Sequence, residues 1–134
     1  MNNRCICTVS CTLIGVISAL FAGVVLGALY FFGILTALVI PLEAVLAFGI
    51  IAFFGISAIS LVSEKCYIKN CICRLRGILY TGAVGTILSS LIALLVSLTP
   101  GAILSAIVIG LVGFFLVLLI AAIICLVSCT ADCD

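Results

Sequence analysis

The chain has 134 residues, of which 68% are hydrophobic and 7% charged, with a net charge of +1 and neither His nor Trp. Soluble globular domains carry about a quarter charged residues, so this composition excludes an ordinary soluble domain and indicates a membrane protein. The small net charge gives no reason to expect nucleic acid or an acidic protein as a partner.

Four long apolar stretches without Lys, Arg or Asp predict four helices, at residues 12–40, 42–63, 78–98 and 101–128. A helix rises about 1.5 Å per residue and needs about 20 apolar residues to cross a hydrocarbon core of about 30 Å, so each stretch is long enough to span a bilayer. The runs are too continuous for the alternating pattern of a membrane β-barrel. We therefore predict an all-α, four-helix transmembrane-type bundle that forms a single domain over residues 1–134.

Two short breaks, Pro41-Leu42-Glu43 and Thr99-Pro100-Gly101, separate the helices within each half of the chain. Proline suits the first turn of a helix, where no amide donor is needed, so each break predicts a tight turn and the chain becomes two tandem helical hairpins. Glu43 is interpreted as an acid that complements a helix N-terminus.

The two halves also share short matches, since Cys5-Ile6-Cys7 recurs as Cys71-Ile72-Cys73. If the halves are copies, they lie parallel about an axis along the membrane normal. Chance matching within a small apolar alphabet is the alternative.

The segment at residues 64–77, EKCYIKNCICRLRG, joins the hairpins and concentrates cysteines and basic residues. Four spans place this segment and both termini on one side of the membrane and both proline turns on the other. All five basic residues then share one side: Arg4, Lys65, Lys69, Arg74 and Arg76. By the positive-inside rule, this side of an integral membrane protein faces the cytoplasm.

The nine cysteines lie on the same predicted side and are candidates for cross-linking or modification: Cys5, Cys7, Cys11, Cys66, Cys71, Cys73, Cys125, Cys129 and Cys133. Their spacings match neither a zinc ribbon nor a ferredoxin pattern, so we expect no metal and no cofactor, although three converging clusters leave metal binding open. The central thiols lie beside Lys69 and Arg74, which favours reactive thiolates and makes lipidation a further alternative.

Disulfides conflict with a cytoplasmic location, because the cytoplasm is reducing. Either the thiols stay reduced, or they oxidise after the cytosol is lost, as on a surface-exposed assembly such as a spore or filament layer. Nine is an odd number, so full oxidation leaves one thiol free or bonded to another chain.

Small residues recur at every fourth position along two of the predicted helices, which predicts helix-packing ridges. These residues are Gly15, Ala19, Gly23 and Gly27 in the first helix, and Gly77, Thr81, Gly85, Ser89, Ala93 and Ser97 in the third. The fourth helix has a shorter series, Ala102, Ala106 and Gly110. Membrane helices associate by close approach over small residues, although such residues are common in these helices anyway.

No catalytic group of residues is recognisable, because the chain has no His and no facing pair of carboxylates, so we do not expect an enzyme. We expect a structural, self-assembling subunit whose partners are other copies of itself and lipid. A small channel or transporter subunit is the alternative, with Glu43, Tyr30 and the hydroxyls of Ser57, Ser60, Ser89 and Ser90 as its polar candidates. Each hydroxyl can instead bond to a carbonyl of its own helix.

Overall fold

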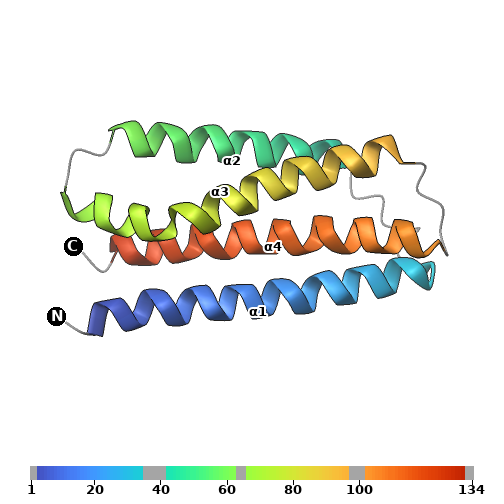
Figure 1. The fold of residues 1–134 in the computed structure, drawn as a ribbon, viewed down its shortest axis with the longest axis horizontal. Coiled ribbons are helices and arrows are strands. Elements are labelled where there is room, and N and C mark those ends of the chain that lie inside the picture. The colour runs from blue at the N-terminus through green and yellow to red at the C-terminus, as the bar shows by residue number, and fades with distance from the viewer. Residues whose placement is uncertain (1–2, 35–41, 63–65, 97–101, 132–134) are drawn as a thin grey trace.

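The computed structural model describes the backbone of residues 3–34, 42–62, 66–96 and 102–131, and the side chains of residues 10–34, 43–59, 75–96 and 102–128. The chain forms four α-helices in these ranges (Figure 1): α1 (Asn3–Phe31), α2 (Leu42–Val62), α3 (Cys66–Leu95) and α4 (Ile103–Ala131). Apolar runs of this length become helices because a helix satisfies its backbone polar groups internally, as lipid requires. The predicted all-α four-helix fold is confirmed.

Three of the helices are long and apolar enough to cross a membrane: Ser10–Phe31 in α1, Leu75–Leu95 in α3 and Ile103–Ser128 in α4. The apolar stretch of α2 with described side chains, Glu43–Ile59, is shorter, so a fourth span stays a prediction. Large apolar side chains are exposed on the helices, for example Phe21, Phe54 and Leu95. Soluble monomers rarely expose so much contiguous apolar surface, and lipid can cover it. The three long apolar helices indicate an integral membrane protein.

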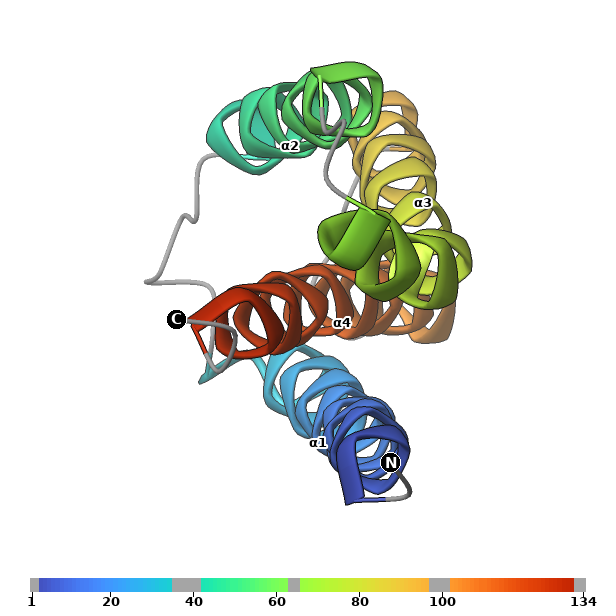
Figure 2. The same cartoon turned by 90° about the vertical axis from the view of Figure 1, so that its left-hand side faces the viewer.

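The helices form an open row in the order α1, α4, α3, α2 (Figure 2). Each helix packs along its neighbour in this row, and within the described residues α1 makes no comparable contact with α2. Consecutive helices α3 and α4 thus form a packed hairpin, whereas α1 and α2 pack against different partners. The first and last helices of the chain are neighbours in space.

Two helices extend differently from the sequence prediction. α1 begins at Asn3 and ends at Phe31. The apolar run alone predicts a start at residue 12 and an end at residue 40. Gly33 follows in the left-handed region, with φ of 73°, and its N–H donates to the carbonyl of Tyr30. Glycine adopts this conformation without steric cost and commonly ends helices, which explains the early stop inside an apolar run.

α3 begins at Cys66, although the sequence predicts its start at residue 78. Most of the segment at residues 64–77 is therefore the start of a helix and only a short part lies outside the described residues. Physically this is reasonable, because the stretch contains no proline and its only glycine is Gly77. Lys, Arg and Leu are good helix formers. The polar composition of the segment indicates the end of the apolar span. A helix can continue beyond the end of its apolar span, so the helix itself begins earlier.

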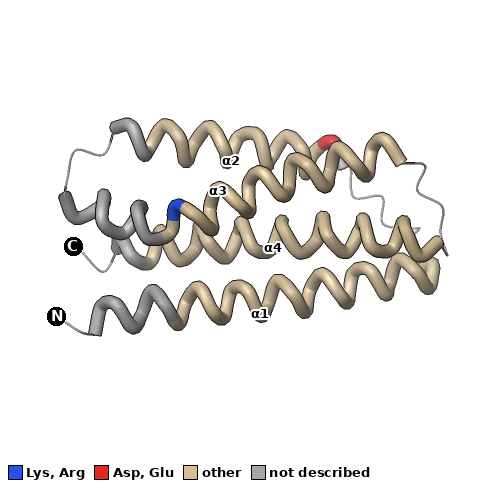
Figure 3. Tube along the Cα trace, in the orientation of Figure 1, with Lys and Arg blue, Asp and Glu red and all other residues tan. Residues whose placement is uncertain are grey.

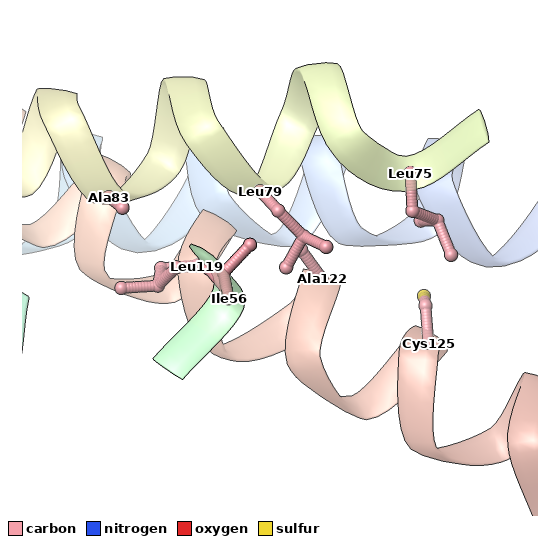
Figure 4. Close-up of a cluster of buried hydrophobic side chains, with 7 residues drawn as sticks. All are labelled: Ile56, Leu75, Leu79, Ala83, Leu119, Ala122 and Cys125. Carbon is pink, nitrogen blue, oxygen red and sulfur yellow. The ribbon is translucent and has the colours of Figure 1, made fainter. Parts of the chain in front are cut away.

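The core lies among α2, α3 and α4 and consists of two clusters of buried side chains. The first (Figure 4) contains Ile56, Leu75, Leu79, Ala83, Leu119, Ala122 and Cys125, and the second contains Val45, Ala93, Val108 and Val112. Each cluster takes residues from all three helices, which places α3 between α2 and α4. In the described residues α1 adds only Cys11 to the edge of the first cluster, so α1 depends on its contact with α4.

Candidate functional site

A disulfide joins α1 to α4 at the end of the bundle where α1 and α3 begin and α4 ends (Figure 1). Cys11 and Cys125 are 114 residues apart in sequence, and their Cα atoms are 6.1 Å apart, within the range of about 4.4–6.8 Å that disulfides span. Cys125 is buried in the first core cluster with Leu75 and Ala122 (Figure 4). The bridge ties the first helix of the chain to the last.

Beyond the bridge, the small residues of α1 lie against α4, a contact that we call the α1–α4 seam. The seam consists of Gly15, Gly23 and Gly27 on α1 and of Ala106, Gly110, Phe114 and Ala121 on α4, and Ala19, between them on α1, is fully buried. A side-chain carbon at Gly23 would lie 2.9 Å from the carbonyl oxygen of Gly110, and one at Gly27 would lie 3.0 Å from that of Ala106. A side chain at Gly23 would require the backbones to shift, and one at Gly27 would be tighter than most real contacts, so the two backbones approach closely.

This close approach supplies the association that lipid does not. Between helices in a bilayer there is little hydrophobic driving force, so dispersion and Cα–H···O contacts hold the pair together. At its outer edge the seam borders an apolar groove of about 530 Å³, whose lining includes Phe31, Phe32 and Phe114. The seam and the bridge together hold α1 in the bundle.

The six small residues of the predicted α3 ridge do not share one face. Gly77 and Thr81 are exposed, whereas Ser89 and Ala93 are buried. A step of four residues turns about 400° around a helix of 3.6 residues per turn, so each step drifts by about 40° and five steps drift by about half a turn. A strict spacing of four therefore winds around the helix, and only its later part meets the neighbouring helices.

Two glycines of α3, Gly82 and Gly85, lie close to α4. The backbone of Gly82 lies against Leu119, and Gly85, a member of the predicted ridge, faces the ring of Phe115. Gly82 does not belong to the series of small residues at steps of four. It lies three residues after Leu79, and mixed steps of three and four from Leu79 would have found it. Ser97, the last member of the predicted ridge, lies outside the described residues.

The buried hydroxyl groups mostly bond to their own helices. Thr86 Oγ1 donates to the carbonyl of Gly82 at 2.7 Å, and Ser89 Oγ donates to the carbonyl of Thr86 at 3.2 Å. Ser90 Oγ is buried without a hydrogen-bond partner. Glu43 and Tyr30 do not join these groups, because Glu43 is exposed in the first turn of α2 and Tyr30 lies near the end of α1. Ser60 is helical, but its side chain is not described.

For the other cysteines, only the position of the backbone in a helix is described. Cys5 and Cys7 belong to the start of α1, Cys66, Cys71 and Cys73 to the start of α3, and Cys129 to the end of α4, while Cys133 lies outside the described residues. These helix ends lie at one end of the bundle (Figure 1). Among the described side chains, no group of three or more Cys, Asp or Glu is arranged to hold a metal ion.

A group that the sequence did not reveal links α2 to α3 near the disulfide. Tyr80 packs edge-on against Phe53, with ring centroids 5.6 Å apart, and its hydroxyl lies 3.3 Å from Ser57 Oγ. The guanidinium carbon of Arg76 lies 5.5 Å from the centroid of the Tyr80 ring. The spacing of four between Arg76 and Tyr80 on a helix was the signal available in the sequence.

Comparison with protein-family models, with curated proteins and with solved structures found no match to this chain. The class of protein is therefore defined by the fold alone, as a hydrophobic helical protein with a disulfide and three helices long enough to span a membrane.

Proposed function

We propose that the protein is a non-enzymatic structural membrane subunit that self-assembles through the cysteines at one end of its bundle. The observation that carries this proposal is the Cys11–Cys125 bridge. It uses two of the nine cysteines and leaves seven, an odd number. When all seven oxidise, at least one in each chain must bond to a partner outside that chain.

The positions of these cysteines along the helices support contact between chains. Cys5 and Cys7 lie two residues apart in α1, as do Cys71 and Cys73 in α3. Residues two apart on a helix do not face each other, so neither pair is arranged to close on itself. Because the helix ends that carry them share one end of the bundle, a second copy in the same orientation brings its own thiols to the same level of the membrane.

The described interior favours a structural role over transport. A pathway for ions normally has polar or charged groups in mid-membrane, where they are costly. Here the buried hydroxyls of Thr86 and Ser89 are bonded to their own helix, and the two described charged side chains, Arg76 and Glu43, are exposed. Tight backbone contact over glycine, as at Gly23, suits a rigid subunit.

The proposed assembly also needs an oxidising environment. Disulfides persist outside the reducing cytoplasm, whereas the basic residues predict that the cysteine end faces the cytoplasm during synthesis. We therefore place the assembled form on a structure released from that compartment, such as a spore or filament layer. Assembly through thiols would then begin when the cytosol is lost.

Non-reducing electrophoresis of native material, alkylated before extraction, tests the proposal. We expect a ladder of covalent oligomers that collapses to a band near 13.9 kDa when reductant is added. A Cys11→Ser/Cys125→Ser variant is the matched control, and it should retain the ladder because the remaining cysteines form the contacts between chains. A monomer with seven alkylatable thiols in unreduced native material would contradict covalent assembly.

A further inference from the structure

Arg76 is the last charged residue of the basic segment at residues 64–77, directly before the apolar stretch of α3. Its side chain is exposed, and among the described side chains no carboxylate pairs with it. The one described acid, Glu43, is in the first turn of α2, at the opposite end of the bundle (Figure 3). A cation beside an apolar helix surface is stabilised by an anionic group, which a lipid headgroup can supply.

The side chain of Arg76 rests on a platform that two helices hold in place. Its guanidinium carbon lies 5.5 Å from the centroid of the Tyr80 ring, within the range of a cation–π contact. Ser57 Oγ donates to the carbonyl of Phe53 at 2.9 Å, so the Tyr80 hydroxyl, 3.3 Å away, is the donor to Ser57. Edge-on packing against Phe53 also holds the ring.

We propose that Arg76, held on Tyr80, binds the phosphate of an anionic phospholipid at the basic end of the bundle. A guanidinium held over an aromatic face by a cation–π contact still has N–H groups in its planar fork to donate. That fork matches two phosphate oxygens, which a lysine ammonium cannot do. Charge complementarity selects the lipid class, because Lys69 and Arg74 precede Arg76 on α3 and add positive potential where anionic headgroups lie.

The site differs from ordinary lipid contact because it selects the headgroup. An exposed apolar surface contacts acyl chains and gives no preference for lipid charge. Arg76 adds one directional contact at the level of the phosphates. This inference does not depend on the proposed assembly, because each chain carries a complete platform formed by its own α2 and α3.

Native mass spectrometry of the full chain in mixed micelles with equal amounts of phosphatidylglycerol and phosphatidylcholine measures this selectivity. The wild-type protein should retain phosphatidylglycerol preferentially. Arg76→Gln should lower that preference by about tenfold, since a charge-assisted hydrogen-bond pair is lost. Arg76→Lys keeps the charge but loses the fork, and should fall between the two. Tyr80→Leu removes the platform and should also weaken the preference.

Glu43→Gln is the matched control, because it changes the net charge by one unit at the far end and should leave the preference unchanged. The proposal is overturned if Arg76→Gln retains phosphatidylglycerol as the wild type does, or if Glu43→Gln shifts retention as strongly as Arg76→Gln. If Arg76→Lys retains phosphatidylglycerol as fully as the wild type, the guanidinium fork is not what binds the phosphate. If Arg76→Gln does not fold, the test rests on Tyr80→Leu. An unchanged preference of that variant for phosphatidylglycerol would contradict the role of Tyr80 in holding Arg76.

Discussion

Gly23 of α1 and Gly110 of α4 face each other so closely that each occupies the space where a side chain of the other would lie. A side-chain carbon at Gly23 would be 2.9 Å from the carbonyl oxygen of Gly110, and one at Gly110 would be 3.0 Å from that of Gly23. A side chain on either residue would therefore press against the backbone of the other helix. This close approach makes the α1–α4 seam a backbone contact, and α1 has no other extensive contact within the described residues.

Gly23→Ala should destabilise the protein, because the added methyl group would force α1 and α4 apart. Overpacking typically costs about 1–3 kcal/mol. Gly55→Ala is the control, since a side-chain carbon at Gly55 would meet nothing within 4 Å and alanine favours a helix. The measurement is the free energy of unfolding in detergent, followed by circular dichroism. Equal stability of the two variants would contradict the backbone contact.

Gly85→Leu and Gly77→Leu should differ sharply, although both residues belong to the predicted ridge on α3. Gly85 faces the ring of Phe115, so a leucine there displaces the ring and loosens the contact between α3 and α4. Gly77 is exposed with open space around it, so a leucine there should be tolerated. Thermal unfolding in detergent distinguishes them. Similar losses for both variants would mean that the whole ridge packs, in conflict with the observed winding.

Removing the Cys11–Cys125 bridge should weaken the attachment of α1 to α4. Native disulfides contribute about 2–4 kcal/mol, and this one closes a loop between residues 114 positions apart. The Cys11→Ser/Cys125→Ser variant should unfold at a lower temperature than the oxidised wild type and should lose most of the wild type's response to reductant. A variant as stable as the oxidised protein would show that the seam alone holds α1.

The number of spans is tested by single cysteines placed in the two proline turns of an otherwise cysteine-free chain. Pro41→Cys and Thr99→Cys should react with an impermeant maleimide from the same side of the membrane, because α2 is predicted to span. A cysteine restored at Cys71 should react only from the other side. Opposite behaviour of the two turns would show that α2 does not cross and would remove the four-span topology.

The sequence was most informative about features that depend on composition. Apolar runs gave the four helices, and Pro41 and Pro100 marked where two helices begin. The regular spacing from Gly15 to Gly27 identified the residues of α1 that lie in the seam. Such features are local, because each requires only one helix and the lipid around it.

Which helix packs against which could not be predicted from the sequence in the same way. Gly23 indicates that another helix approaches α1 closely. That this helix is α4 depends on Gly110, which lies far along the chain and contacts Gly23. The pairing of Cys11 with Cys125 likewise depends on the spatial order of the helices. The early end of α1 rests on the left-handed conformation of Gly33, whereas its neighbours in sequence continue the apolar run.

Assembly through thiols is tested most directly by mapping disulfides in material assembled from equal amounts of unlabelled and ¹⁵N-labelled chains. Mass spectrometry of unreduced peptides then separates bridges within a chain from bridges between chains. We expect Cys11–Cys125 peptides only in unmixed isotopic pairs, because this bridge lies within one chain. We expect peptides from the starts of α1 and α3 and from the end of α4 in mixed pairs. If no cysteine gives mixed pairs, the proposed covalent assembly is wrong.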